Sequence, residues 1–232
     1  AGEQRGASRN SLAPPPAPRV ATVGPRFYLC GARSGYPVPS QTMTTEPDYR
    51  AAWERAFPWE TYLHDEVREH RALWLAMARR RELPAWALAR LRAAARPTKL
   101  LVLSEDWCGD AVNSVPILAR LAAALPELLE LRILKRDENP ELMDRYLTNG
   151  ARSIPLALVL STDYEPLGRW GPRPRVLQEW VLAEKRAGLR GTDELYREVR
   201  TWYARDRGES TLRELIEIIA PEPAGATHPR GG

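Results

Sequence analysis

The segment Trp107-Cys108-Gly109-Asp110-Ala111 holds the residue of this 232-residue chain that is best placed to do chemistry, Cys108. It follows the apolar run 100–103, which is typical of a buried strand, and it precedes a helical pattern over residues 109–125. A sulfur at such a junction lies near free backbone N–H groups and the positive end of the helix dipole. Both stabilise a thiolate, the nucleophilic form of cysteine. Asp110 opposes this effect unless it caps the helix instead, so we expect only a mildly lowered thiol pKa.

The other cysteine, Cys30, and the three histidines show no spacing that would make a metal site. His64 and His70 are six residues apart and do not share a helix face, as two metal ligands on one helix would. We expect both on the surface or at the edge of a helix. No histidine follows or precedes Cys108 closely, which gives little support to an acyl-transfer cysteine protease. We predict no metal and no resident cofactor.

The charge of the chain is concentrated in its first residues. The formal net charge is +4, but residues 1–42 hold five arginines and one acid, while residues 43–232 hold 29 basic and 29 acidic groups. A neutral body does not favour nucleic acid as a partner. No run of 18 apolar residues exists, so we predict no membrane span. Nothing in the sequence indicates an oligomeric state.

Residues 1–42 are rich in proline and arginine and show no helical or strand period, so we expect a disordered tail. Its composition would also suit a transit peptide, but its prolines break the amphipathic helix that such a peptide needs. The pattern changes at Met43, which raises the alternative that the tail is a gene-start artefact. We expect a cytoplasmic protein with a second, frayed tail over residues 221–232.

The elements that must position Cys108 follow from periodicity. Residues 60–80 predict one amphipathic helix, and a second one runs from Pro84 to the residue before Pro97. These helices would form an N-terminal helical extension over residues 43–96. The remaining expected elements are strands over 100–103, 129–134, 155–160 and 165–170, and helices over 109–125, 141–147, 176–187, 192–205 and 211–219. Thr211 and Glu214 fit a capping box for the last helix.

Four features of the region 97–185 occur together in order and spacing. Trp107-Cys108-Gly109 fits the start of a Trp-Cys-Gly-Pro-Cys motif, and Pro116 lies eight residues beyond Cys108 inside the expected helix. Ile154-Pro155 precedes an apolar strand, and a hairpin ends at 168–171. This region resembles the thioredoxin superfamily, and the single-cysteine Trp-Cys-Gly-Asp-Ala motif resembles a bacterial branch of it. The resemblance implies an α/β fold, a central mixed sheet of about four strands with flanking helices, over residues 97–220 with C-terminal helices.

The departures from the family motif bear on function. Ala111 stands where the family has its second, resolving cysteine, and Val102 where it has a buried aspartate. The resemblance therefore implies a possible oxidoreductase without a resolving thiol, acting through monothiol exchange at Cys108. Its partners would be protein or small-thiol disulfides, with glutathione or another low-molecular-weight thiol as co-substrate. Cys30 would resolve the product only if the tail folded back.

The remaining site residues also follow from the resemblance. The expected substrate groove is formed by Trp107, Gly109, Asp110, Ile154 and Pro155. The alternative is a redox-inactive binding module that uses this cis-proline groove without covalent chemistry. An iron–sulfur cluster is not expected, because the Cys-Gly-Phe-Ser motif of cluster-binding monothiol glutaredoxins is absent.

Aromatic and basic residues outside the motif are expected to be structural. In contrast to Trp107, the other seven tryptophans are predicted to pack in the core. They are Trp53, Trp59, Trp74, Trp86, Trp170, Trp180 and Trp202. Arg173 and Arg175 lie beside a rigid turn, where they could bind an anionic partner. We expect instead a solvated loop before the 176–187 helix.

Overall fold

The computed structural model describes residues 46–79, 83–188 and 190–222. Its centre is a five-stranded sheet in the order β1-β3-β2-β4-β5. The strands are β1 (Phe57–Pro58), β2 (Thr98–Ser104), β3 (Leu129–Lys135), β4 (Leu156–Leu160) and β5 (Pro166–Trp170). β2 and β3 are parallel, and the other neighbours are antiparallel. The mixed sheet is the expected one, with one strand more than expected.

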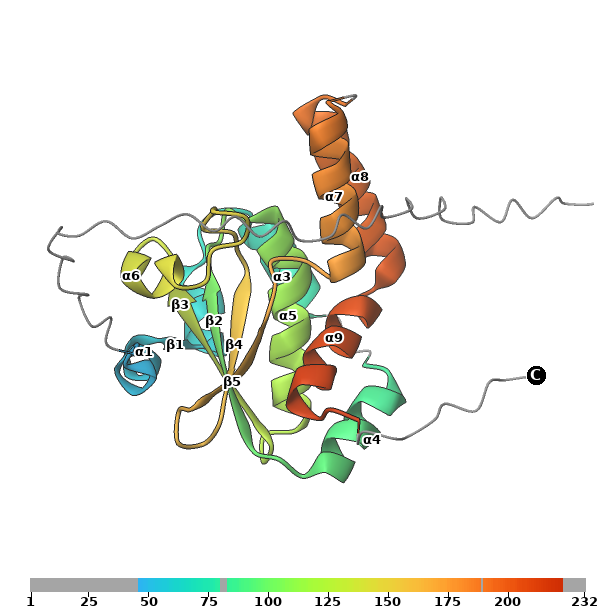
Figure 1. The fold of residues 1–232 in the computed structure, drawn as a ribbon. Coiled ribbons are helices and arrows are strands. Elements are labelled where there is room, and N and C mark those ends of the chain that lie inside the picture. Colours follow the sequence, from blue (N-terminus) through green and yellow to red (C-terminus); the bar gives the residue numbers. More distant parts are fainter. Residues whose placement is uncertain (1–45, 80–82, 189, 223–232) are drawn as a thin grey trace, which may run out of the picture. The chain divides into compact units, whose positions relative to one another are not determined.

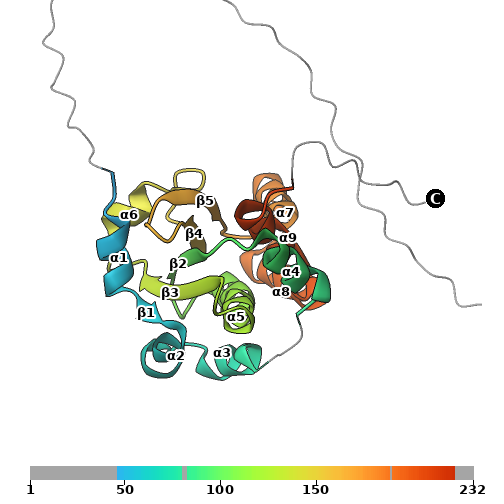
Figure 2. The same ribbon diagram turned by 90° about the horizontal axis from the view of Figure 1, so that it is seen from below.

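The sheet is covered by helices on both faces. Helices α5 (Gly109–Ala124) and α9 (Glu209–Ile219) lie on one side of it, and α1 (Tyr49–Arg55) and α6 (Pro140–Asp144) lie on the other (Figure 2). Burial from both sides explains why β2 and β4 are continuous apolar runs instead of alternating ones, since every residue of Leu156–Leu160 is buried. β2 ends at the junction that carries Cys108.

The segment before β2 departs from the single helix expected over 60–80. It forms α2 (Trp59–Thr61), a π-helical turn η1 (Tyr62–Glu66), a break and α3 (Arg71–Ala78). In the break, the backbone N–H groups of Arg68 and Glu69 both donate to the Asp106 carboxylate at 2.7 Å. A carboxylate that takes up these N–H groups interrupts the helical ladder and fastens the break to the loop before Cys108. The periodicity of the sequence does not report this tertiary partner.

The segment 43–96, expected to be helical, also contributes to the sheet. β1 pairs antiparallel with β3, with Phe57 opposite Ile133. Helix α4 (Ala85–Ala94) lies close to where the second helix is expected. Tyr62 and Trp74 are fully buried in the same apolar cluster as the central strands. Residues from this segment and from the sheet therefore share one core.

The C-terminal helices form a second apolar cluster and then return to the first. Helices α7 (Arg175–Ala187) and α8 (Thr192–Asp206) run side by side (Figure 1). Their contact buries a cluster that contains Leu177, Val181, Leu195, Val199 and Tyr203. Helix α9 instead buries Leu212, Leu215, Ile216 and Ile219 in the main core.

The capping box expected at Thr211 and Glu214 is wrong. α9 begins at Glu209, two residues earlier than expected, so Thr211 lies inside the helix. Glu214 makes two other contacts: it accepts from Trp170 Nε1 at 3.0 Å and from the backbone N–H of Arg175 at 2.7 Å. Its carboxylate therefore joins α9 to the end of β5 and the start of α7.

The aromatic residues behave as expected. Each of the seven tryptophans outside the motif is buried in one of the two apolar clusters or packs against it, whereas Trp107 is exposed. Several expectations fall outside the described residues. They concern the predicted tail 1–42 with Cys30, the pattern change at Met43, and residues 223–232. Among the described helices, none combines the length and the apolar character that crossing a bilayer requires.

Candidate functional site

Cys108 occupies the N-cap position of α5, directly after the loop that leaves β2. Its thiol donates to the carbonyl of Ile154 at 3.5 Å, across 46 positions of sequence. The Ile154–Pro155 peptide bond is cis. The antiparallel pairing of β2 with β4 explains this meeting, because it places the start of β4 beside the end of β2. The structure thus brings together Cys108, Ile154 and Pro155.

The thiol is more protected than its position at a helix start suggests. Only 8% of Cys108 is exposed. Burial raises the pKa of this thiol above its ordinary value, and the Asp110 carboxylate adds to the rise. The N–H groups of Ala111 and Asp110 and the Arg173 guanidinium lower the pKa by less. The expected lowering of the thiol pKa is therefore wrong in direction, because desolvation of the charged form outweighs the helix N-terminus.

Asp110 is held by side chains from the C-terminal part of the chain. Arg173 donates Nη2 to Oδ2 at 2.5 Å and Nε to Oδ1 at 2.9 Å, and the Tyr203 hydroxyl donates to Oδ1 at 3.1 Å. Asp110 is buried and Arg173 is largely shielded from water, with 8% and 11% of their side chains exposed. The expectation of a solvated loop is wrong for Arg173, which lies in the site.

Trp107, which directly precedes Cys108, is 45% exposed. The Arg136 guanidinium lies over its ring, 4.9 Å from the ring centroid. Arg136 also donates to the carbonyl of Arg152 at 3.0 Å. The indole is thereby linked through Arg136 to the loop that precedes Pro155.

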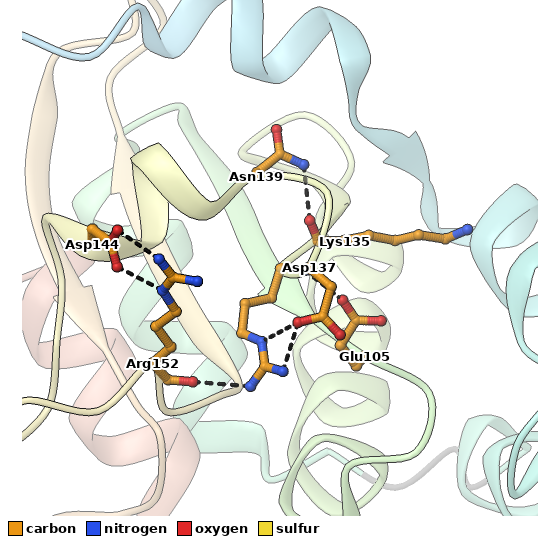
Figure 3. A network of polar contacts seen from close by, with 7 residues as sticks. Glu105, Lys135, Asp137, Asn139, Asp144 and Arg152 are labelled. Carbon is orange, nitrogen blue, oxygen red and sulfur yellow. Dashed lines mark hydrogen bonds and ion pairs between the residues drawn. The ribbon is translucent and has the colours of Figure 1, made fainter.

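A network of polar contacts supports this loop (Figure 3). The backbone N–H of Asp137 donates to Glu105 at 2.8 Å, and burial raises the pKa of that carboxyl. Arg152 forms a two-pronged ion pair with Asp144, at 2.6 and 2.7 Å. These contacts fix the residues just before Cys108 and those just before Pro155 to one another through the end of β3.

A pocket of about 400 Å³ lies on the α8 side of the motif. It is lined by His70, Gly109, Asp110 and Asn113 and by residues of α8. A small molecule could therefore reach the first turn of α5 from this side. His64 lies away from it, at the surface, 3.5 Å from Glu60. The described ranges contain no group of three or more His, Cys, Asp or Glu arranged to hold a metal ion.

Sequence reasoning set Arg173 aside as part of a solvated loop, and it missed Tyr203 and the partners of Glu105 and Asp106. Arg173 carried one signal, since it follows the hairpin end at Gly171-Pro172 that must return toward Pro155. Tyr203 carried none, because its position in an amphipathic helix predicts only burial.

Comparisons with known proteins identify the class to which this fold and site belong. The sequence model of the family described as Thioredoxin matches residues 57–190, so the chain belongs to the thioredoxin family. A Thioredoxin from Rhodospirillum rubrum is 32% identical over 79 residues, which are 34% of this chain and 73% of that protein. The expected thioredoxin-like α/β fold is confirmed.

Two solved structures share the fold. An HIV epitope-scaffold protein is 20% identical, with a TM-score of 0.59 over 75% of this chain and 99% of that chain. A protein of unknown function from Pseudomonas aeruginosa is 21% identical, with a TM-score of 0.59 over 75% of this chain and 98% of that chain. At these identities the likeness concerns the fold alone.

Proposed function

We propose that this thioredoxin-family protein carries out monothiol exchange through Cys108, forming mixed disulfides with protein or low-molecular-weight thiols. One observation supports this most: Cys108 occupies the N-cap position of α5, and its thiol donates to the Ile154 carbonyl at 3.5 Å, beside Pro155. Trp107, Gly109, Asp110, Ile154 and Pro155 would form the surface that receives the disulfide. The single-cysteine Trp-Cys-Gly-Asp-Ala motif would then be characteristic of the branch of the thioredoxin superfamily to which this chain belongs.

The exchange needs two external sulfur compounds. The Cys108 thiol first loses its proton to solvent, and the thiolate attacks one sulfur of a disulfide. The new bond joins Cys108 to that sulfur, the old S–S bond breaks, and the other half leaves as a thiolate. A free thiol such as glutathione then attacks the mixed disulfide and releases Cys108. Because Ala111 offers no resolving thiol, the cycle suits a reducing compartment, and we propose the cytoplasm.

A redox-inactive binding module is the second candidate. The burial of Cys108 and the raised pKa of its thiol favour this alternative, because both reduce the amount of accessible thiolate near neutral pH. The exposed Trp107 and the backbone of Ile154 would then bind an extended segment of a partner without forming a covalent bond.

Oxidised glutathione separates the two functions. In a Cys30→Ser background, Cys108 is the sole thiol. We expect intact mass and peptide mapping to show one glutathionyl adduct on Cys108, formed faster as the pH rises and removed by reduced glutathione. The Cys108→Ser variant in the same background is the control. If no adduct forms even at alkaline pH, monothiol exchange is excluded and the binding module is favoured.

A further inference from the structure

We propose that Arg173 is a positioning residue of the thiol site, because its pairing with Asp110, largely shielded from water, offsets part of the effect of that carboxylate on the neighbouring sulfur. The inference rests on the proposed function, since it concerns the thiol that the exchange requires. It assigns a role to a basic residue that lies 65 positions beyond Cys108 and outside the family motif.

The pairing has the geometry of a strong interaction. Two guanidinium nitrogens contact the two carboxylate oxygens, at 2.5 and 2.9 Å, which is the two-pronged arrangement that arginine forms best. Gln178 Oε1 accepts from Nη1 of Arg173 at 2.8 Å and fixes the guanidinium from α7. Because both side chains are largely shielded from water, their interaction is screened less than it would be at the surface.

The carboxylate lies in the same helical turn as the thiol. Cys108 is the N-cap of α5, and Asp110 is the second residue of the helix. The groups that face the thiol electrostatically are Asp110 from α5, Arg173 from the β5–α7 loop and Tyr62 from η1. Burial raises the pKa of Tyr62, which keeps this hydroxyl neutral. The charged side chains that shift the thiol pKa most are therefore those of the Asp110–Arg173 pair, whose net charge is zero.

The sign of the effect follows from the charges of the pair. A negative charge near the sulfur disfavours the thiolate, and a positive charge favours it. Without Arg173, one uncompensated negative charge would stand in the turn that must accommodate a thiolate. The pKa of the thiol would then rise. Without Asp110, the uncompensated charge would be positive and the thiol pKa would fall.

Asp110 and its partners also join two parts of the fold. Tyr203, which belongs to the apolar cluster of the α7–α8 hairpin, donates a hydrogen bond to Asp110 in α5. A merely structural role, in which the pair fastens the hairpin to α5, would lower stability in both single variants. It would not move the thiol pKa in opposite directions. The opposite signs distinguish the two roles.

The experiment measures the pH dependence of iodoacetamide alkylation of Cys108 in the Cys30→Ser background. We expect Arg173→Met to raise the thiol pKa and to slow alkylation at slightly alkaline pH roughly 3- to 10-fold, since one pKa unit is a tenfold change in thiolate. Asp110→Asn should lower the pKa, and the double variant should return it toward the parent value. Arg173→Lys, which keeps the charge, should show less than half of the shift.

Arg175→Met is the matched control, because Arg175 is an exposed arginine two residues further on. An unchanged pKa in Arg173→Met, or an equal shift in Arg175→Met, would overturn the proposal. If Arg173→Met does not fold, the thiol pKa is compared between Asp110→Asn and the double variant Asp110→Asn/Arg173→Met. Equal thiol pKa values in these two variants would overturn the proposal. A lower thiol pKa in Asp110→Asn than in the double variant would support the proposal. The alkylation pKa is measurable even if no glutathione adduct forms, so failure of the proposed function is distinguishable.

Discussion

At the scale of single residues, Cys108 is subject to opposing influences that only the folded chain can weigh. The start of α5 and the Arg173 guanidinium favour the thiolate, while burial and Asp110 oppose it. Burial is the largest of these effects because the sulfur lies against the Ile154 carbonyl with little contact to water. The expectation from sequence used the helix start and Asp110 but had no measure of burial.

The native thiol should therefore react more slowly than the same thiol in the unfolded chain at neutral pH. A raised pKa in the folded state means that stability is lost as the pH rises from the unfolded thiol pKa through the folded one. We expect urea unfolding of the Cys30→Ser protein to show this alkaline loss, and the loss to be smaller when Cys108 is also replaced by Ala. Equal alkaline losses in the two proteins would contradict the raised pKa.

At the scale of elements, the site depends on close approach between the end of β5 and the start of β4. Gly171 follows β5 with φ of 121°, and a Cβ at this position would lie 2.1 Å from the carbonyl oxygen of Pro155. That neighbour is backbone, so the loop that carries Ile154 and Pro155 would have to move. Glycine is required here both by its φ and by the contact.

Gly171→Ala should lower the free energy of unfolding by about 2–3 kcal/mol and should slow adduct formation at Cys108. Gly191→Ala is the control, because Gly191 has φ of −68° and, among the described residues beyond its two chain neighbours, no atom lies within 4 Å of the place that an alanine Cβ would take. We expect that control to change stability by less than about 0.5 kcal/mol. Urea unfolding measures both variants. Equal effects at the two glycines would contradict the close approach to Pro155.

At the scale of the whole molecule, the described residues include two apolar clusters, and the larger one is shared between segments far apart in sequence. It contains Tyr62 and Trp74 from before β2, the central strands, and Leu215 and Ile216 from α9. We still propose that residues 1–42 and 221–232 are tails and that residues 43–96 extend a domain over residues 97–220. The shared core allows the boundaries of this domain to be tested.

A fragment limited to residues 97–220 should not fold, since it lacks Tyr62 and Trp74, two of the largest fully buried side chains. Removing large aromatic side chains from a core costs about 3–5 kcal/mol each, against a total stability of about 5–15 kcal/mol. A fragment of residues 43–222 should fold, with near-ultraviolet circular dichroism and cooperative urea unfolding like those of the full chain. A cooperatively folded 97–220 fragment would contradict the shared core.

The sequence by itself determined the order of elements after residue 97 and the two short segments on which the site is built. Apolar runs and helical periods are local properties, and the segments 107–111 and 154–155 each carry a recognisable motif. The sequence also determined that Ala111 removes the resolving thiol. These local features can be predicted from the sequence because they depend on residues close together along the chain.

The tertiary structure decided the break before α3, the start of α9, the strand β1, the burial of Cys108 and the pairing of Asp110 with Arg173. Each of these depends on a group brought from elsewhere in the chain: Asp106 for the break, Ile154 for the thiol, and Arg173 for Asp110. Hydrogen bonds, ion pairs and desolvation act between neighbours in space, and sequence periodicity reports only neighbours along one element. The motif supplied a thiol at a helix start, and its tertiary partners set the charge and solvent exposure around that thiol.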